Sequence, residues 1–224
     1  MKADMRLGLF GGSFDPVHLG HLRAAEELSA HFMFDRVIFI PAAQHPHKQP
    51  VGSADFRHRL AMLKLAIKNR PGFEVTDLEE SLPRPSYTVN TLRALKEKEK
   101  GELFFLVGYD SFQSIRKWRG YEELMSLVSL VVFRRPGQWA LPGDREALGR
   151  LLTGIMGGEP LWDETREAFV RPGFNPVHYY QGLRLDISST YIKERLAYGD
   201  SVRYLVPEEV RVYLAGHGLY NPKN

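Results

Sequence analysis

Short apolar runs alternate with segments of helical spacing along most of the chain, and this alternation constrains the fold more than any other feature. The strand-like runs lie at 6–10, 36–42, 73–78, 102–108 and 127–135. Runs that are apolar at nearly every position are typical of parallel strands buried on both faces. The sequence therefore predicts an α/β fold, with a parallel sheet covered by helices on both faces and ligands bound beyond the carboxyl ends of its strands.

Helices are predicted between these strands, where apolar residues recur every three or four positions. Their ranges are 19–32, 54–67, 87–100 and 121–126. Nearer the end of the chain, LRLDISSTYIKERLAYG and VPEEVRVYLAGHG predict a strand and two helices, each helix ended by a glycine.

The stretch from Pro136 to Pro176 departs from this rhythm. It is rich in Gly and Pro and contains one helical pattern, DREALGRLLTGIM. We interpret residues 1–224 as a single domain with an insertion expected at 138–176 and a small C-terminal helical part at 188–217.

Composition narrows the chemistry that is open to the chain. Its 224 residues include no cysteine, which excludes disulfides, thiolate metal sites and a cysteine nucleophile. No apolar run is long enough for a signal peptide or a membrane span, so we expect a cytoplasmic protein that does not contact a membrane. The net charge of +3 comes from basic residues spread along the chain, so a nucleic-acid partner is not expected. The sequence does not decide between a monomer and a homodimer.

One segment, LFGGSFDPVHLGH at 9–21, holds more special residues than a turn needs. Gly11 and Gly12 end the first strand, where the backbone must turn tightly or let a ligand approach closely. The next helix begins near 16–19, and its free N–H groups and positive dipole end suit a phosphate. His18 and His21 are three residues apart and so lie on one face of that N-terminus. We expect both to be neutral N–H donors until a polyphosphate favours their protonation.

Plainer interpretations of this segment exist. A glycine pair alone is usually a simple turn, and a lone histidine near a helix start usually caps or packs. A zinc site is not favoured, because only Asp15 stands nearby as a third ligand and the spacing is not that of a zinc protease. The combined string is much more specific than its parts.

The chain resembles a known family at two signatures. GGSFDPVHLGH resembles the first signature of the nucleotidylyltransferases with an H-x-G-H motif, and ISSTYIKERL resembles their second, I-S-x-T-x-I-R. IPAAQHPHK, RPSYTVNTL, FFLVGYDSFQSIRKW and VVFRRPG follow in the order found in bacterial nicotinate-nucleotide adenylyltransferases. The resemblance covers nearly the whole chain and is least clear at 138–176. It implies a Rossmann-like doubly wound fold and Mg²⁺-dependent transfer of AMP from ATP to nicotinate mononucleotide, giving deamido-NAD and pyrophosphate.

The resemblance also implies roles for individual residues. For ATP binding it implies Gly11, Gly12, Ser13, Phe14, His18, His21, Gly108, Asp110, Ser188, Ser189, Thr190 and Lys193. For binding of the nicotinate nucleotide it implies Asp15, Lys48, Tyr87, Thr88, Trp118 and Arg135. The expected catalytic residues are His18, His21 and Lys193, and Mg²⁺ is expected on the ATP phosphates with no protein ligand assigned.

Such a reaction needs no protein nucleophile, because the phosphate of the acceptor is already anionic. Positioning and charge stabilisation would carry the catalysis. Some of the implied residues have an equally plain structural interpretation: Thr88 as a helix cap, Trp118 as a core residue and Lys48 as a solvated loop lysine. Lys193 stands where the second signature usually has arginine, and lysine lacks the bidentate fork. We therefore expect retained activity with weaker ATP binding.

Two other functions stay open at this stage. The first is a related transferase with another acceptor, such as nicotinamide mononucleotide, phosphopantetheine or glycerol 3-phosphate. The second is a nucleotide-binding protein without catalysis. PSYTVNTL and GYDSFQSIRKW weigh against the first, and the intact pair of His18 and His21 weighs against the second.

Overall fold

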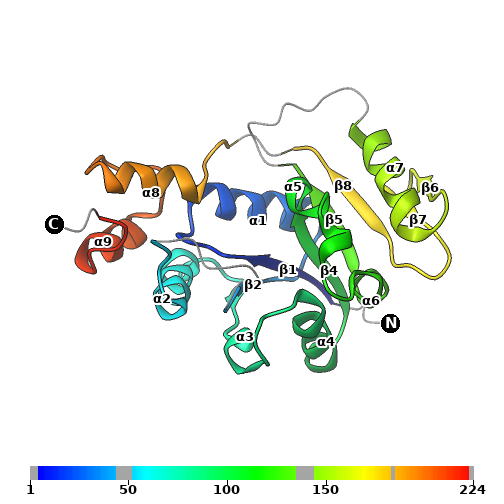
Figure 1. Cartoon of the computed structure of the whole chain (residues 1–224), viewed down its shortest axis with the longest axis horizontal. Helices are drawn as coiled ribbons and strands as arrows, with labels where there is room; N and C mark the ends of the chain where they lie inside the picture. The colour runs from blue at the N-terminus through cyan, green and yellow to red at the C-terminus, as the bar shows by residue number, and fades with distance from the viewer. Residues whose placement is uncertain (1–4, 44–51, 135–143, 183–184, 222–224) are drawn as a thin grey trace. The chain divides into compact units, whose positions relative to one another are not determined.

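The computed structural model describes residues 5–43, 52–134, 144–182 and 185–221 (Figure 1). The chain forms two compact units. One comprises Met1–Phe10 with Tyr87–Arg184, and the other comprises Gly11–Ser86 with Leu185–Asn224. The boundary falls inside the first strand, β1 (Arg6–Gly12), so this strand contributes residues to both units.

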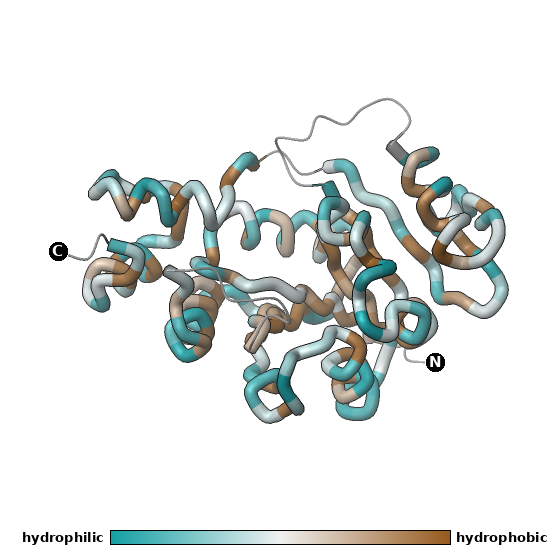
Figure 2. The backbone as a smooth tube through the Cα atoms, in the orientation of Figure 1, coloured by the Kyte–Doolittle hydropathy of each residue, from teal (hydrophilic) through white to brown (hydrophobic). Residues whose placement is uncertain are grey.

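The first unit is built on a mostly parallel set of strands. β1 pairs in parallel with β4 (Glu102–Gly108), β4 with β5 (Ser129–Phe133), and β5 with β8 (Val177–Tyr180). The register places Phe10 opposite Leu106 and Leu106 opposite Val131. The two central strands, β4 and β5, carry the brown of hydrophobic residues in Figure 2, and nearly all of their side chains are buried.

Two short strands at the end of this set run antiparallel. β7 (Ala168–Val170) pairs antiparallel with β8, and β6 (Leu161–Asp163) pairs antiparallel with β7. The predicted α/β class with a parallel sheet is confirmed for the main strands, whereas the expectation of an entirely parallel sheet is wrong at this end. The turn after β6 is tight, because Asp163 Oδ1 accepts from the backbone N–H groups of Thr165 and Arg166. So short a connection joins antiparallel strands only.

Helices of the first unit follow its strands. They are α4 (Thr88–Lys98), α5 (Tyr109–Phe112), the 3₁₀ turn Ile115–Lys117, α6 (Tyr121–Leu127) and α7 (Asp144–Met156). α7 confirms the helix predicted inside the 136–176 stretch. The interpretation of the whole chain as a single domain with an insertion at 138–176 stays a prediction.

The second unit continues from the end of β1. Its elements are α1 (Leu19–Phe32), β2 (Arg36–Pro41), α2 (Phe56–Ile67), β3 (Phe73–Val75), α3 (Leu78–Ser81), α8 (Ser189–Ala197) and α9 (Glu208–Gly216). β2 pairs in parallel with β3, and α1, α2 and α3 all contact β2. The Gly12 carbonyl accepts from the Ala42 N–H at 2.9 Å, which ties the end of β1 to the residue after β2.

One predicted strand is wrong. Residues 185–188 form no strand; they lead directly into α8 as exposed or half-buried chain. The last strand of the described chain is β8 instead, whose sequence VHYY looks polar but consists of β-branched and aromatic residues that favour strands. No helix in the described residues is long and apolar enough to cross a membrane.

We predict that Leu106→Ala destabilises the protein by about 2–5 kcal/mol, because it removes a fully buried side chain between two paired strands. Leu161→Ala is the matched control, since Leu161 is 73% exposed in β6 and should change stability by less than about 0.5 kcal/mol. Urea unfolding followed by circular dichroism measures both. Similar losses for the two variants would contradict the assignment of the core.

Candidate active site

The segment from Gly12 to His18 connects β1 to α1 and forms the centre of the second unit. Phe14 adopts a left-handed backbone (φ 49°), and its side chain is fully buried against Phe39 and His21, with ring centroids 5.8 and 4.9 Å away. A Cβ on Gly12 would lie 3.1 Å from the Phe14 ring, so this position favours glycine. The Phe14 side chain therefore packs against His21, and its expected role at ATP stays a prediction.

His18 and His21 cap the first turn of α1 reciprocally. His18 is the N-cap residue, and its Nδ1 accepts from the His21 backbone N–H at 3.3 Å. The Nδ1 of His21 accepts in turn from the His18 backbone N–H, also at 3.3 Å. The two rings stack with centroids 3.7 Å apart and planes 24° apart.

This capping geometry favours one protonation state of both rings. An Nδ1 atom that accepts a hydrogen bond carries no proton, so a capping imidazole is neutral with its proton on Nε2. The positive end of the α1 dipole also disfavours imidazolium at this place. The expectation of two neutral N–H donors stays a prediction. The structure shows a histidine pair in place of the usual Ser or Asp cap.

Gly20 is required between these histidines by close contacts. A Cβ at Gly20 would lie 3.0 Å from His18 Nδ1 and 3.3 Å from the Ile187 carbonyl oxygen. The glycine therefore gives room to the His18 ring and to Ile187, the first residue of the second signature.

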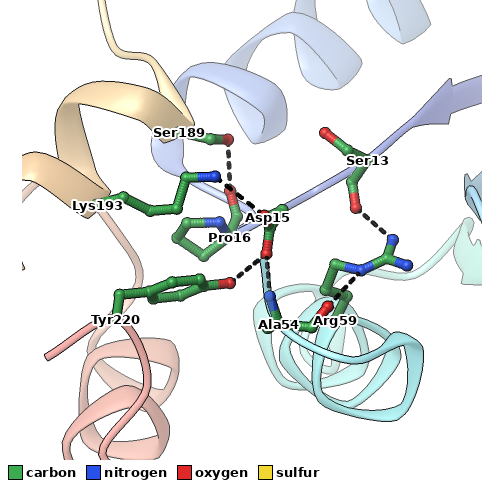
Figure 3. Close-up of polar contacts among 8 residues, drawn as sticks. All are labelled: Ser13, Asp15, Pro16, Ala54, Arg59, Ser189, Lys193 and Tyr220. Atoms are coloured by element: carbon green, nitrogen blue, oxygen red, sulfur yellow. Dashed lines mark hydrogen bonds and ion pairs between the residues drawn. The ribbon is translucent and has the colours of Figure 1, made fainter. Parts of the chain in front are cut away.

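Asp15 is the most heavily bonded polar side chain of the segment (Figure 3). It is 5% exposed. Its Oδ1 accepts from the Ala54 N–H at 3.0 Å and from the Tyr220 hydroxyl, and its Oδ2 accepts from Lys193 Nζ at 3.1 Å. Asp15 therefore contacts the segment before α2, helix α8 and the turn after α9, and its expected role at the nicotinate nucleotide stays a prediction.

The environment of Asp15 keeps its carboxylate charged. Burial alone would raise the pKa of Asp15, but the hydrogen bonds from Tyr220, Ala54 and Lys193, together with the Lys193 charge, hold the pKa below the usual 3.8. Burial and the bond to Asp15 raise the pKa of Tyr220 well above its ordinary value, so the phenol stays a donor. A buried ion pair with its remaining lone pairs satisfied is the arrangement that offsets the cost of desolvation.

Arg59 holds the same segment from α2. This arginine is 3% exposed, and it donates to the carbonyl oxygens of Ser13 (2.7 Å), Ala42 (2.7 Å) and Ala54 (3.1 Å). It fixes the backbone of Ser13 against the end of β2. Burial lowers the pKa of Arg59, and the nearby Asp15 charge opposes that shift.

The second signature lies beside the first. Ser188 is the N-cap of α8 and accepts from the Tyr191 N–H at 3.1 Å, while Ser189 Oγ donates to the Pro16 carbonyl at 2.9 Å. Thr190 is exposed in the first turn of α8. Lys193 lies one turn further on and is held by Asp15. The structure thus brings together His18 with His21, Asp15 with Lys193, and Ser189 with the first signature.

The other expected site residues belong to the first unit. Gly108 ends β4 and Asp110 lies exposed in α5. α4 begins at Thr88, so the N-cap position falls on Tyr87 and not, as expected, on Thr88. Trp118 is half-buried with its ring 6.4 Å from that of Phe105, which fits its plainer interpretation as a packing residue.

Two expected residues, Lys48 and Arg135, lie outside the described residues. Three residues that shape the site were missed by sequence reasoning: Arg59, Glu79 and Tyr220. Glu79 is buried and accepts from the Ala43 N–H at 3.0 Å. Only Arg59 left a signal, since it falls three and four residues before the buried Met62 and Leu63, on the apolar side of its helix.

We predict a pH-dependent stability contribution from Asp15. Because its pKa is lowered by folding, the contribution is complete above the ordinary value of 3.8 and is lost as the pH falls through the folded pKa. At pH 7, Asp15→Asn should cost about 2–3 kcal/mol, less than the roughly 3–5 kcal/mol of a fully buried pair, because Lys193 keeps some solvent contact. Urea unfolding from pH 7 to pH 3 should show the gap between the two proteins shrinking below pH 4. A difference in the free energy of unfolding that stays constant over this pH range would refute the prediction.

We predict that Gly20→Ala displaces the His18 ring and breaks the reciprocal cap, at a cost of about 1 kcal/mol. Gly216→Ala is the matched control, because a Cβ there meets nothing within 4 Å and should stabilise α9 by up to about 1 kcal/mol. Thermal unfolding with imidazole ¹⁵N chemical shifts measures both effects. Unchanged histidine shifts in Gly20→Ala would contradict the account of the cap.

Comparison with known proteins places this geometry in a family. The family model described as cytidylyltransferase-like matches residues 9–195. A protein of Desulfatibacillum aliphaticivorans named "Probable nicotinate-nucleotide adenylyltransferase" is 40% identical over 223 residues, covering 96% of this chain and 100% of the relative. A protein of the same name from Geobacter sulfurreducens is 42% identical over 217 residues, covering 96% of this chain and 98% of the relative.

A solved structure shares the fold. It is the nicotinic acid mononucleotide adenylyltransferase of Plasmodium falciparum complexed with NaAD, with a TM-score of 0.71 at 17% identity over 96% of this chain and 97% of that one. This likeness supports the Rossmann-like fold, and the sequence relatives decide the family. The chain belongs to the cytidylyltransferase-like family and, within it, to the nicotinate-nucleotide adenylyltransferases.

Proposed function

We propose that this protein transfers AMP from ATP to nicotinate mononucleotide, giving deamido-NAD and pyrophosphate in the synthesis of NAD. The observation that carries the proposal is the stacked, reciprocally capped pair of His18 and His21 at the start of α1. The names of the relatives at about 40% identity support the acceptor, as does the NaAD bound in the Plasmodium falciparum structure.

The chemistry follows from what these groups can do. The acceptor phosphate attacks the α-phosphorus of ATP in line, the new P–O bond forms as the bond to the β-phosphate oxygen breaks, and pyrophosphate leaves with the electron pair. The Nε2–H groups of His18 and His21 can donate to phosphate oxygens, and the α1 N-terminus adds its backbone N–H groups. No proton must be removed from the nucleophile, so positioning and charge stabilisation supply the rate enhancement.

Further binding roles are proposed on the resemblance. Gly11, Gly12, Ser13 and the start of α8 with Ser188 and Thr190 accompany the histidines at ATP, and Lys193 adds a positive charge. Gly108 and Asp110 are assigned to the adenosine and bridging region. Tyr87, Thr88, Trp118, Lys48 and Arg135 are assigned to the nicotinate nucleotide.

Mg²⁺ is proposed to arrive with ATP as part of the substrate. The described residues hold no group of three or more His, Asp or Glu side chains that could bind a metal ion by themselves. ATP phosphates and a few carboxylate or water ligands suit Mg²⁺ better than a cage of protein groups. Location in the cytoplasm remains a prediction from the sequence, which does not decide between a monomer and a homodimer.

We predict that His21→Ala lowers turnover about 10²–10³-fold with little change in the KM of the acceptor, because a donor to the transition state is lost. His18→Asn separates capping from catalysis, since asparagine is a good N-cap residue but lacks the ring. It should keep stability within about 1 kcal/mol while turnover falls by a similar factor. Full turnover in either variant would overturn that histidine's role.

The assay that tests the function measures pyrophosphate release from Mg·ATP with several acceptors in parallel. Nicotinate mononucleotide should be used in strong preference to its amide, and phosphopantetheine should not react. Preference for another acceptor would move the chain to a related transferase. Binding of ATP without turnover on any acceptor would instead make it a nucleotide-binding protein.

A further inference from the structure

The last described part of the chain returns to the first signature. After α9 the chain turns through Gly218 and Tyr220, both with left-handed backbones (φ 59° and 63°). The Leu219 N–H donates to the Leu214 carbonyl at 3.1 Å, which fixes this turn to α9. A non-glycine residue in this backbone region is uncommon and is held by its surroundings. The turn directs the Tyr220 side chain to Asp15, as Figure 3 shows.

The Tyr220 hydroxyl determines how the Asp15 carboxylate is shared. It donates to Oδ1, the oxygen that also accepts from the Ala54 N–H. Oδ2 is thereby left to Lys193 Nζ at 3.1 Å. The Tyr220 ring also lies near the ammonium, with 6.0 Å from Nζ to the ring centroid. The phenol therefore contacts the ion pair both through its hydroxyl and through its ring.

The contact of Tyr220 with the Asp15–Lys193 ion pair bears on catalysis, because Lys193 occupies the position where the second signature usually has arginine. Lysine is a single point charge on a flexible stem, so an external partner must fix its position, whereas an arginine fork is itself preorganised. Asp15 is that partner, and it lies in the segment between Gly12 and the histidine cap. A carboxylate that rotates would move the ammonium relative to the α1 N-terminus.

We propose that Tyr220 is a positioning residue for adenylyl transfer: by donating to Asp15 Oδ1 it fixes the carboxylate that holds the Lys193 ammonium for the ATP phosphates. The inference rests on the proposed function and deepens it, since it makes the C-terminal turn part of ATP handling. Tyr220 contacts no substrate in this account and acts only through Asp15 and Lys193.

The test compares Tyr220→Phe with Tyr204→Phe. Tyr204 has the same left-handed backbone (φ 64°), but it is 82% exposed, so its ring is not buried in the site. Tyr220→Phe should raise the KM for ATP roughly three- to tenfold, the range of the net contribution of one hydrogen bond, and leave the KM for the acceptor unchanged. Tyr204→Phe should change neither constant. An unchanged KM for ATP in Tyr220→Phe, or an equal rise in both KM values, would overturn the proposal.

The pH profile gives a readout that loss of stability would not move. The charged and titratable groups that face Asp15 are Lys193, Arg59 and Tyr220. Without the phenol donor, burial raises the pKa of Asp15, so the acid limb of kcat/KM for ATP should move to higher pH. A limb that stays in place, with only the melting temperature lowered, would reduce Tyr220 to a structural residue.

A double-mutant cycle tests the route through Lys193. In a Lys193→Ala background, Tyr220→Phe should have no further effect on the KM for ATP, because the group that it positions is gone. If Tyr220→Phe raised the KM for ATP by the same factor with and without Lys193, Tyr220 would not act through Lys193. Failure of the proposed function is seen separately, in the wild-type protein: it would show no pyrophosphate release with nicotinate mononucleotide, whatever the variants do.

Discussion

The buried carboxylate of Asp15 is the interaction on which the rest of the second unit depends. A carboxylate without solvent costs several kcal/mol unless donors surround it, and here the donors come from three distant parts of the chain. Ala54 precedes α2, Lys193 lies in α8 and Tyr220 follows α9. The buried carboxylate is stable only with these donors around it. It therefore favours the arrangement in which the start of α2, helix α8 and the turn after α9 all contact the segment after β1.

The histidine pair likewise satisfies polar groups that would otherwise lack hydrogen-bond partners. His18 and His21 satisfy each other's backbone N–H groups, so the helix start is capped without Ser, Thr or Asp. The same bonds occupy both Nδ1 atoms and leave the protons on Nε2. In the proposed reaction, capping uses the Nδ1 atoms and phosphate binding would use the Nε2 atoms of the same rings. Residues needed for local folding could then also serve the proposed catalysis. A Cβ on Gly20 would lie 3.0 Å from His18 Nδ1, which is why a small residue is favoured between them.

Charge is arranged in pairs around the first signature. Asp15 balances Lys193 and lies near Arg59, while Arg59 itself is saturated by the carbonyl oxygens of Ser13, Ala42 and Ala54. Arg59 thus binds backbone carbonyl oxygens, whereas Lys193 is the cation on a flexible side chain that binds Asp15. The ion pair with Asp15 holds the Lys193 ammonium in place and leaves the buried carboxylate with a cationic partner.

Local spacing and backbone preference were enough to predict the alternation of strands and helices, the turn at Gly11 and Gly12, the helix that begins near 16–19 and the two signatures. The sequence alone could not show that Phe14 is core, that Asp15 binds Lys193, or that Arg59 and Tyr220 complete the site. It also missed β8, whose residues look polar, and predicted a strand before α8, where the described residues 185–188 form exposed or half-buried chain. Only the tertiary structure decided these points, because a buried charge finds its partners through space, across as many as 205 positions of the chain between Asp15 and Tyr220.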